Sequence, residues 1–173
     1  MTSRGERPDR RLTDPATLLV GYLDFYRAIV AAKVDGLSDA ELRTSRLPSG
    51  WTPIELLKHL VYMERRWLVW GFLAEPVPDP WGDADAEDRW VVAEDETVGD
   101  LIARLLAGGE RTRSIVAAAD LADVAPFGGR FSSTDDDPPP TLGWILHHIL
   151  QEYARHAGHL DIARELADGA TGE

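Results

Sequence analysis

The sequence predicts an all-α protein built as a four-helix bundle. Four segments place apolar residues at the three- and four-residue spacing of amphipathic helices. The alternation typical of a β-strand is short wherever it occurs, and "RWVVAE" at residues 89–94 is its best example. A connection of about twenty residues separates the second predicted helix from the third, as in bundles that contain one long connection.

The first helix is predicted over residues 15–34, where an apolar stripe recurs at helical spacing. Turn residues follow in "DGLSDAELRTSRLPSG", with room for one short helical turn at 39–44. The second helix has the clearest start, because Thr52 suits the N-cap, a proline follows it and Glu55 completes a capping box. We expect this helix to end near Ala74, where prolines follow.

The third helix is predicted to begin behind Thr97 and to run to about Ala119. Two adjacent glycines at 108–109 weaken its middle and predict a kink there. The last helix is capped by Thr141 and is expected to reach about Leu166.

Two long loops connect these helices. The first, at 75–95, is acidic and contains Trp81 and Trp90. These tryptophans could cover a pocket as a lid, although packing onto the end of the bundle is the simpler interpretation. The second loop, "PFGGRFSSTDDDPPP" at 126–140, is rich in glycine, proline and aspartate.

The length predicts a single domain over 15–168, with a flexible lead at 1–14 and a frayed end at 169–173. The basic start has no apolar run behind it that could serve as a signal peptide. Charges interrupt every apolar run too early for a membrane span. We therefore expect a cytoplasmic protein without a membrane partner.

The net charge of -12 opposes binding to nucleic acid, because phosphate contacts need clustered lysine and arginine. The chain contains no cysteine, which excludes disulfides, thiolate metal ligands and a cysteine nucleophile. Any thiol that takes part in its chemistry must therefore come from a ligand. The sequences "HExxH", the P-loop and "GxGxxG" are absent as well.

Histidines are concentrated in "ILHHILQEYARHAGHLDIARE" at 145–165, which holds four of the five. Within it, Glu152 and His156 lie one helical turn apart on the flank of the apolar face, a spacing that suits two ligands of one metal ion. His59, on the second helix, lies at the edge of an apolar stripe and could supply a third ligand. The ordinary alternatives are a hydrogen-bonded structural histidine and an i,i+4 polar pair.

The remaining histidines are predicted to lie outside this group. His147 points away and should be solvated, while His148 and His159 lie towards the edge of the apolar sector. Arg66 and Arg155 flank the helices that carry the candidate ligands and could bind a ligand carboxylate. Solvent-facing charge is the simpler interpretation of both arginines.

Three stretches of the chain resemble the DinB-like superfamily, most strongly an actinobacterial branch of it. They are "WTPIELLKHLVYMERRWL", the "TVGDLIARL" helix with "RW" before it, and "TLGWILHHILQEYARHAGHLDIARE". The resemblance extends from about residue 15 to 168, and "HHILQEYARHAGHLD" is its specific part. It implies a four-helix bundle, in agreement with the helical pattern.

The resemblance also implies a divalent metal held by one residue of the second helix and two residues of the last. These positions correspond to His59, Glu152 and His156. The glutamate makes the triad similar to that of mycothiol-dependent maleylpyruvate isomerase, and His159 falls where a second-shell or pocket residue is expected. Such a donor set accepts zinc, nickel, iron or manganese, so it does not select one ion.

On this resemblance we expect a metal-dependent enzyme that uses mycothiol or a similar low-molecular-weight thiol. Its reaction would be S-transfer to a small electrophile, or an isomerisation. Two alternatives stay open, namely a hydrolase that activates metal-bound water and a non-catalytic, stress-associated protein that binds metal or ligand. A homodimer is compatible with the resemblance.

Overall fold

The computed structural model describes residues 5–171, and within them every regular element is a helix. The elements are α1 (Pro15–Val34), α2 (Asp39–Leu42), α3 (Pro53–Arg65), the π-helical η1 (Arg66–Phe72), α4 (Val98–Ala118) and α5 (Leu142–Asp168). The short alternating segment at 89–94 contributes only an isolated bridge between Trp90 and Ala84. The all-α class is therefore confirmed.

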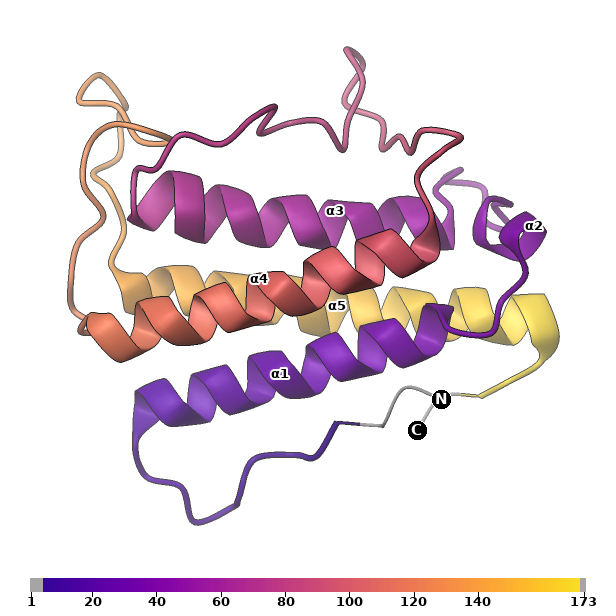
Figure 1. Cartoon of the computed structure of the whole chain (residues 1–173), viewed down its shortest axis with the longest axis horizontal. Coiled ribbons are helices and arrows are strands. Elements are labelled where there is room, and N and C mark those ends of the chain that lie inside the picture. Colours follow the sequence, from indigo (N-terminus) through magenta and orange to yellow (C-terminus); the bar gives the residue numbers. More distant parts are fainter. Residues whose placement is uncertain (1–4, 172–173) are drawn as a thin grey trace.

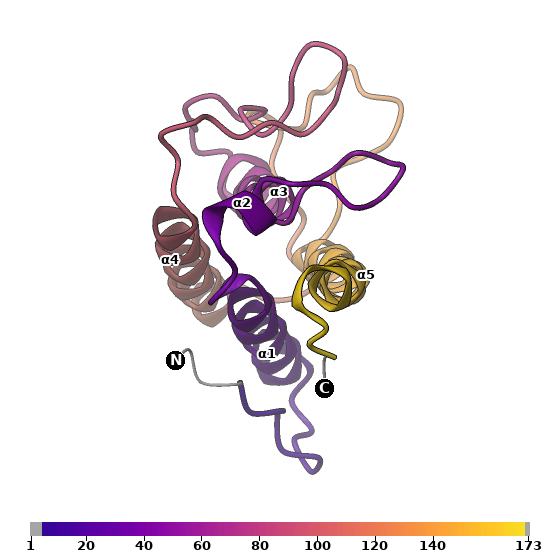
Figure 2. The same cartoon turned by 90° about the vertical axis from the view of Figure 1, so that its right-hand side faces the viewer.

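The four long helices lie side by side (Figure 1), with α1 and α3 each packed against both α4 and α5. Seen from the end in Figure 2, α1 and α3 occupy opposite corners of this arrangement. The segment 73–97 runs along the side of α3 that faces away from α1 (Figures 1 and 2). Among the described helices, none has the length and apolarity needed to cross a membrane.

Local signals determine where the helices begin and end. At the start of α3, the hydroxyl of Thr52 accepts from the Glu55 backbone N–H, and the Glu55 carboxylate accepts from the Thr52 N–H at 2.8 Å. The end of α5 is closed by Gly169, whose φ of 77° lies in the left-handed region that favours glycine. The expected bounds agree with the observed ones to within about two residues, the usual uncertainty of helix ends.

The glycine pair does not interrupt α4, which is helical throughout Val98–Ala118. Gly109 lies against the side chain of Arg27, and a Cβ at this position would come within 3.1 Å of the Arg27 Cδ atom. Gly108 has more room, with its nearest neighbour 3.9 Å from such a Cβ. Gly109 thus makes space for a buried side chain of another helix.

A buried polar network joins the four long helices through the carboxylate of Glu64. Arg27 of α1 donates to both of its oxygens, and Thr112 of α4 donates to one of them. The hydroxyl of Tyr153 on α5 donates to the other oxygen at 2.6 Å. All four residues are at most 3% exposed, so the carboxylate needs these donors to offset its burial. The network fixes the rotation of α5 against α3.

The first described residues lie against α1. A Cβ at Gly21 of this helix would come within 3.0 Å of the Pro8 Cβ atom. The predicted flexibility of residues 1–4 and the predicted fraying at 172–173 fall outside the described residues.

Candidate metal centre

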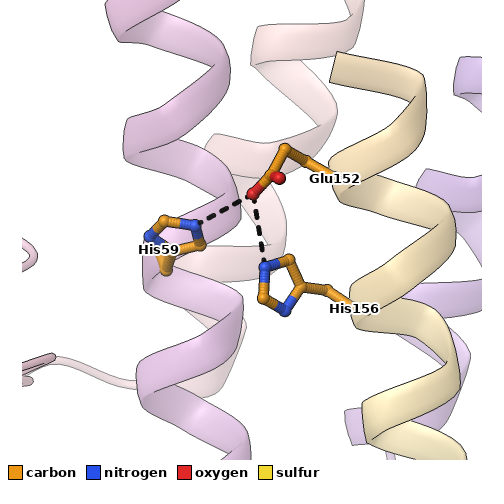
Figure 3. A group of neighbouring side chains, drawn as sticks. All are labelled: His59, Glu152 and His156. Atoms are coloured by element: carbon orange, nitrogen blue, oxygen red, sulfur yellow. Dashed lines mark ion pairs between the residues drawn. The ribbon is translucent and has the colours of Figure 1, made fainter. Parts of the chain in front are cut away.

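Three side chains from two helices converge beside the segment 73–97. His59 comes from α3, and Glu152 and His156 come from successive turns of α5. One ligand atom from each residue lies within 4.8 Å of the others (Figure 3). The structure therefore brings together the three residues that the sequence singled out.

Both imidazoles direct Nε2 towards the same carboxylate oxygen. Glu152 Oε2 lies 3.7 Å from Nε2 of His59 and 3.4 Å from Nε2 of His156 (Figure 3). Two ligands at about 2.1 Å from a tetrahedral ion are themselves about 3.4 Å apart. The donor set and its spacing therefore fit a divalent ion.

The other ring nitrogen of His59 is occupied by a carboxylate. Nδ1 of His59 lies 3.2 Å from Oδ2 of Asp83, a residue of the segment 73–97 that is only 2% exposed. Asp83 is held in turn by a two-pronged contact from the guanidinium of Arg66. Histidine ligands of metals commonly donate their second N–H to a carboxylate, which fixes the tautomer and leaves the other nitrogen free.

Asp83 is charged despite its burial. Burial by itself raises the pKa of Asp83, but hydrogen bonds from His59 and Arg66 outweigh it and hold the pKa below its ordinary value. An ionised Asp83 can only accept hydrogen bonds, so its contact with His59 requires a proton on Nδ1. The other ring nitrogen, Nε2 of His59, then faces Glu152.

His156 is neutral at physiological pH. Burial, and then the nearby His59, lower the pKa of His156 to about 4, although Glu152 acts in the opposite direction. Its Nδ1 lies 3.2 Å from Nδ1 of His159, so the second nitrogen again has a polar neighbour. His159 therefore touches a candidate ligand, as the family resemblance implied.

Aromatic rings enclose the group. Trp90 stacks on His59 with ring centroids 4.4 Å apart, and its edge meets the ring of His156. On the far side of His159, Trp51 lies 5.8 Å away between ring centroids. Trp90 thus covers the candidate ligands instead of packing onto the end of the helices.

A cavity of about 600 Å³ opens beside these rings. Trp51 and Trp90 form its apolar walls, while Glu55 and Arg89 add charged groups. Because the two tryptophans also contact the histidines, the cavity adjoins the candidate metal centre. The cavity is large enough for a small molecule to bind next to the candidate centre.

The two other histidines of α5, His147 and His148, differ in their exposure. His147 is exposed, as expected, and its Nδ1 lies 2.7 Å from the carbonyl of Gly143. His148 is partly buried between Trp67 and Trp144, and this burial lowers its pKa. His148 therefore lies at the edge of the apolar sector, as predicted, and contacts aromatic rings there.

The two arginines differ from each other. Arg155 is exposed, in agreement with the simpler interpretation. Arg66 is 5% exposed and bound to Asp83, so its interpretation as solvent-facing charge is wrong. Sequence reasoning missed Asp83 entirely, because it stands among many acidic residues of one loop and no spacing distinguishes it.

Comparison with known proteins gives one assignment. A family model described as Mycothiol-S-transferase matches residues 18–169, which is most of the chain. The match confirms the resemblance noted from the sequence. A search of curated proteins gave no match.

Proposed function

Because the chain belongs to the mycothiol S-transferase family, a DinB-like family, we propose that it is a metal-dependent enzyme that uses a thiol of the mycothiol type. Its reaction is S-transfer to a small electrophile, or the isomerisation of one. In this proposal residues 15–168 form a single DinB-like four-helix bundle, with the acidic loop 75–95 over the active site.

The observation that carries the proposal is the convergence of His59, Glu152 and His156 on one point (Figure 3). We infer that these three side chains hold a divalent ion. Three protein ligands leave coordination positions open for water or substrate, which is typical of catalytic rather than structural sites. A divalent ion held there would favour the thiolate form of a thiol ligand.

The chain's own residues prepare this chemistry. Asp83 orients His59 through its Nδ1, and His159 contacts Nδ1 of His156, so that both imidazoles present Nε2 to the centre. Trp90 covers one face of the His59 ring and contacts the ring of His156. In the transfer, the thiol sulfur bonds to the electrophilic carbon, the leaving group departs with its electron pair, and the thiol proton goes to solvent.

The absence of cysteine supports an external thiol, because the chain itself has no sulfur nucleophile. Mycothiol enters the proposal through the family that matches the chain. The three ligands by themselves do not determine which electrophile is accepted; the side chains around the centre do.

Metal analysis tests the first part of the proposal. Protein purified under metal-replete conditions should carry one divalent ion per chain, and His59→Ala and Glu152→Ala should each carry much less. His147→Ala is the matched control, because this histidine is exposed, and it should keep the ion. Wild-type protein without metal would refute the centre.

Thiol transfer tests the second part. The metal-loaded protein should accelerate the reaction of mycothiol with a chlorinated bimane, and the metal-free protein should not. A stoichiometric ion without acceleration, across a panel of thiols and electrophiles, would favour the alternative of a non-catalytic binding protein. Hydrolysis of ester or amide substrates without any thiol would instead favour a metal-dependent hydrolase.

A further inference from the structure

Arg130 is a cation with no anionic partner among residues 5–171. It lies between α4 and α5 in the chain, and its partly buried guanidinium is 4.2 Å from the ring centroid of Trp67 and 5.4 Å from that of Trp81. Buried charges in proteins are normally paired. Burial, and then the nearby Arg66, lower the pKa of Arg130.

The neighbouring cation is already neutralised. Arg66 is held by Asp83 in a two-pronged ion pair, so these two side chains together contribute no net charge. Arg130 therefore adds one uncompensated positive charge beside Trp67 and Trp81, although the net charge of the whole chain is -12. A single carboxylate group would balance it.

The backbone holds Arg130 in place. Its N–H donates to the carbonyl of Trp70 on η1 at 3.1 Å. The preceding Gly129 has a φ of 55°, and a Cβ there would lie only 2.1 Å from the same carbonyl oxygen. Only glycine allows this close approach, so the loop is anchored on η1 and the guanidinium is positioned before any ligand arrives.

Arg130 lies at one end of the candidate metal centre. Trp67, beneath its guanidinium, contacts the ring of His148 at 4.5 Å between centroids. His148 precedes Glu152 by one turn of α5, and the charges of both Glu152 and Arg130 act on its pKa in opposite directions. The cavity beside Trp51 lies at the other end, beyond His159.

We propose that Arg130 binds the carboxylate of the electrophilic co-substrate, which is therefore a small organic acid with an apolar or aromatic body. A guanidinium presents two parallel N–H donors that match a carboxylate. The apolar body would lie against Trp81 and Trp144, which are 49% and 52% exposed. This inference rests on the proposed function, whose centre supplies the reacting thiol.

Binding of an unreactive acid tests Arg130 without any reaction. The probes are p-toluate and its neutral counterpart p-toluamide, and the readout is quenching of tryptophan fluorescence in the metal-loaded protein. Wild-type protein should bind toluate more tightly than toluamide, by about 10- to 100-fold, as expected for a hydrogen bond to a charged group. Arg130→Met should abolish the preference, and Arg130→Lys should retain part of it.

Transfer kinetics test the same contact in the reaction. The electrophiles are p-(bromomethyl)benzoate and p-(bromomethyl)benzamide, in which mycothiol sulfur bonds to the benzylic carbon and bromide leaves. The ratio of their kcat/KM values should fall by about 10- to 100-fold in Arg130→Met, while kcat/KM for the amide stays close to wild type. Arg155→Gln, which removes an exposed arginine of α5, should keep the wild-type ratio.

Two results would overturn the inference. One is an unchanged preference for the acid in Arg130→Met, and the other is a loss of preference in Arg155→Gln instead. Failure of the proposed function is distinguishable from both, because it would abolish transfer from mycothiol to either electrophile. The toluate measurement still decides whether Arg130 binds a carboxylate in that case.

Discussion

His59 is defined by what its two ring nitrogens contact. Asp83 occupies Nδ1, and Glu152 faces Nε2. Arg66 completes the chain of contacts by holding Asp83 in its ionised form. One imidazole is thus oriented by a carboxylate of a loop, and the loop is oriented by a guanidinium of η1.

Asp83→Asn should weaken metal binding by about 10- to 100-fold, the usual effect of removing a carboxylate that orients a histidine ligand. The neutral amide no longer pairs with Arg66 and no longer requires a proton on Nδ1 of His59. Competition with a chelating indicator measures the affinity. The matched control is Asp85→Asn, which removes a carboxylate of the same loop that pairs with Arg89, and it should bind metal normally. Equal losses in the two variants would contradict a specific role for Asp83.

Tyr153 should make the protein sensitive to alkali. Burial, and then the charge of Glu64, raise the pKa of Tyr153 well above its ordinary value of 10.0. Because the folded-state pKa is raised, the phenol's contribution is fully present below pH 10 and is lost as pH rises above it. Tyr153→Phe should reduce the decline in unfolding free energy above this pH by up to about 1.4 kcal/mol per pH unit.

Urea unfolding of both proteins at several alkaline pH values checks this expectation. The comparison uses the slope with pH, not the stability at one pH, because Tyr153→Phe also removes the hydrogen bond to Glu64. Identical slopes would show that another group dominates alkaline unfolding.

Each long helix begins at a capping residue and contributes one side chain to the buried polar network at Glu64. In α3 the capping box of Thr52 and Glu55 begins the helix, and Glu64 near its end accepts from the other three long helices. The helix then continues as the π-helical η1, which contains Arg66 and Trp67. π-helical turns are frequently found at functional sites.

The two glycines of α4 should respond differently to alanine. Gly108→Ala has room for a methyl group and should raise the unfolding free energy by up to about 1 kcal/mol, because alanine favours helix. Gly109→Ala would press on the buried side chain of Arg27 and should lose that gain or become destabilising. Urea unfolding of the two variants side by side provides the measurement. Equal stabilisation by both would show that Arg27 moves aside freely.

On the scale of the whole molecule, the candidate centre joins two helices that lie far apart in the chain. The polar network at Glu64 holds α3 and α5 in register, so that His59 faces Glu152 and His156. Metal binding should therefore stabilise the entire fold and not a single loop.

Zinc at about 100 times its dissociation constant should raise the unfolding free energy by about 2.7 kcal/mol, because the ion binds the folded state alone. Urea unfolding at buffered free zinc, with and without a chelator, measures this effect. Glu152→Ala should abolish the zinc response, and Glu165→Ala, which removes an exposed carboxylate of the same helix, should keep it. A response that survives in Glu152→Ala would place the stabilising ion elsewhere.

Much of the fold was predictable because its signals are local. Apolar spacing identified the long helices, and capping residues such as Thr52 located their ends. The packing role of Gly109 was not predictable, because the Arg27 side chain that lies against it belongs to another helix. For the same reason the buried network of Arg27, Glu64 and Tyr153 left no sign in the sequence pattern.

The sequence by itself determined the all-α class and the helix bounds, and together with the family resemblance it predicted the three residues that could bind metal. The class and the bounds depend on periodicity along single helices, which a one-dimensional pattern records. Only the tertiary structure decided that Asp83 orients His59, that Arg66 is buried and that Arg130 stays unpaired beside the centre. Such residues lie on loops or pair across elements, and their neighbours are set by packing rather than by sequence spacing.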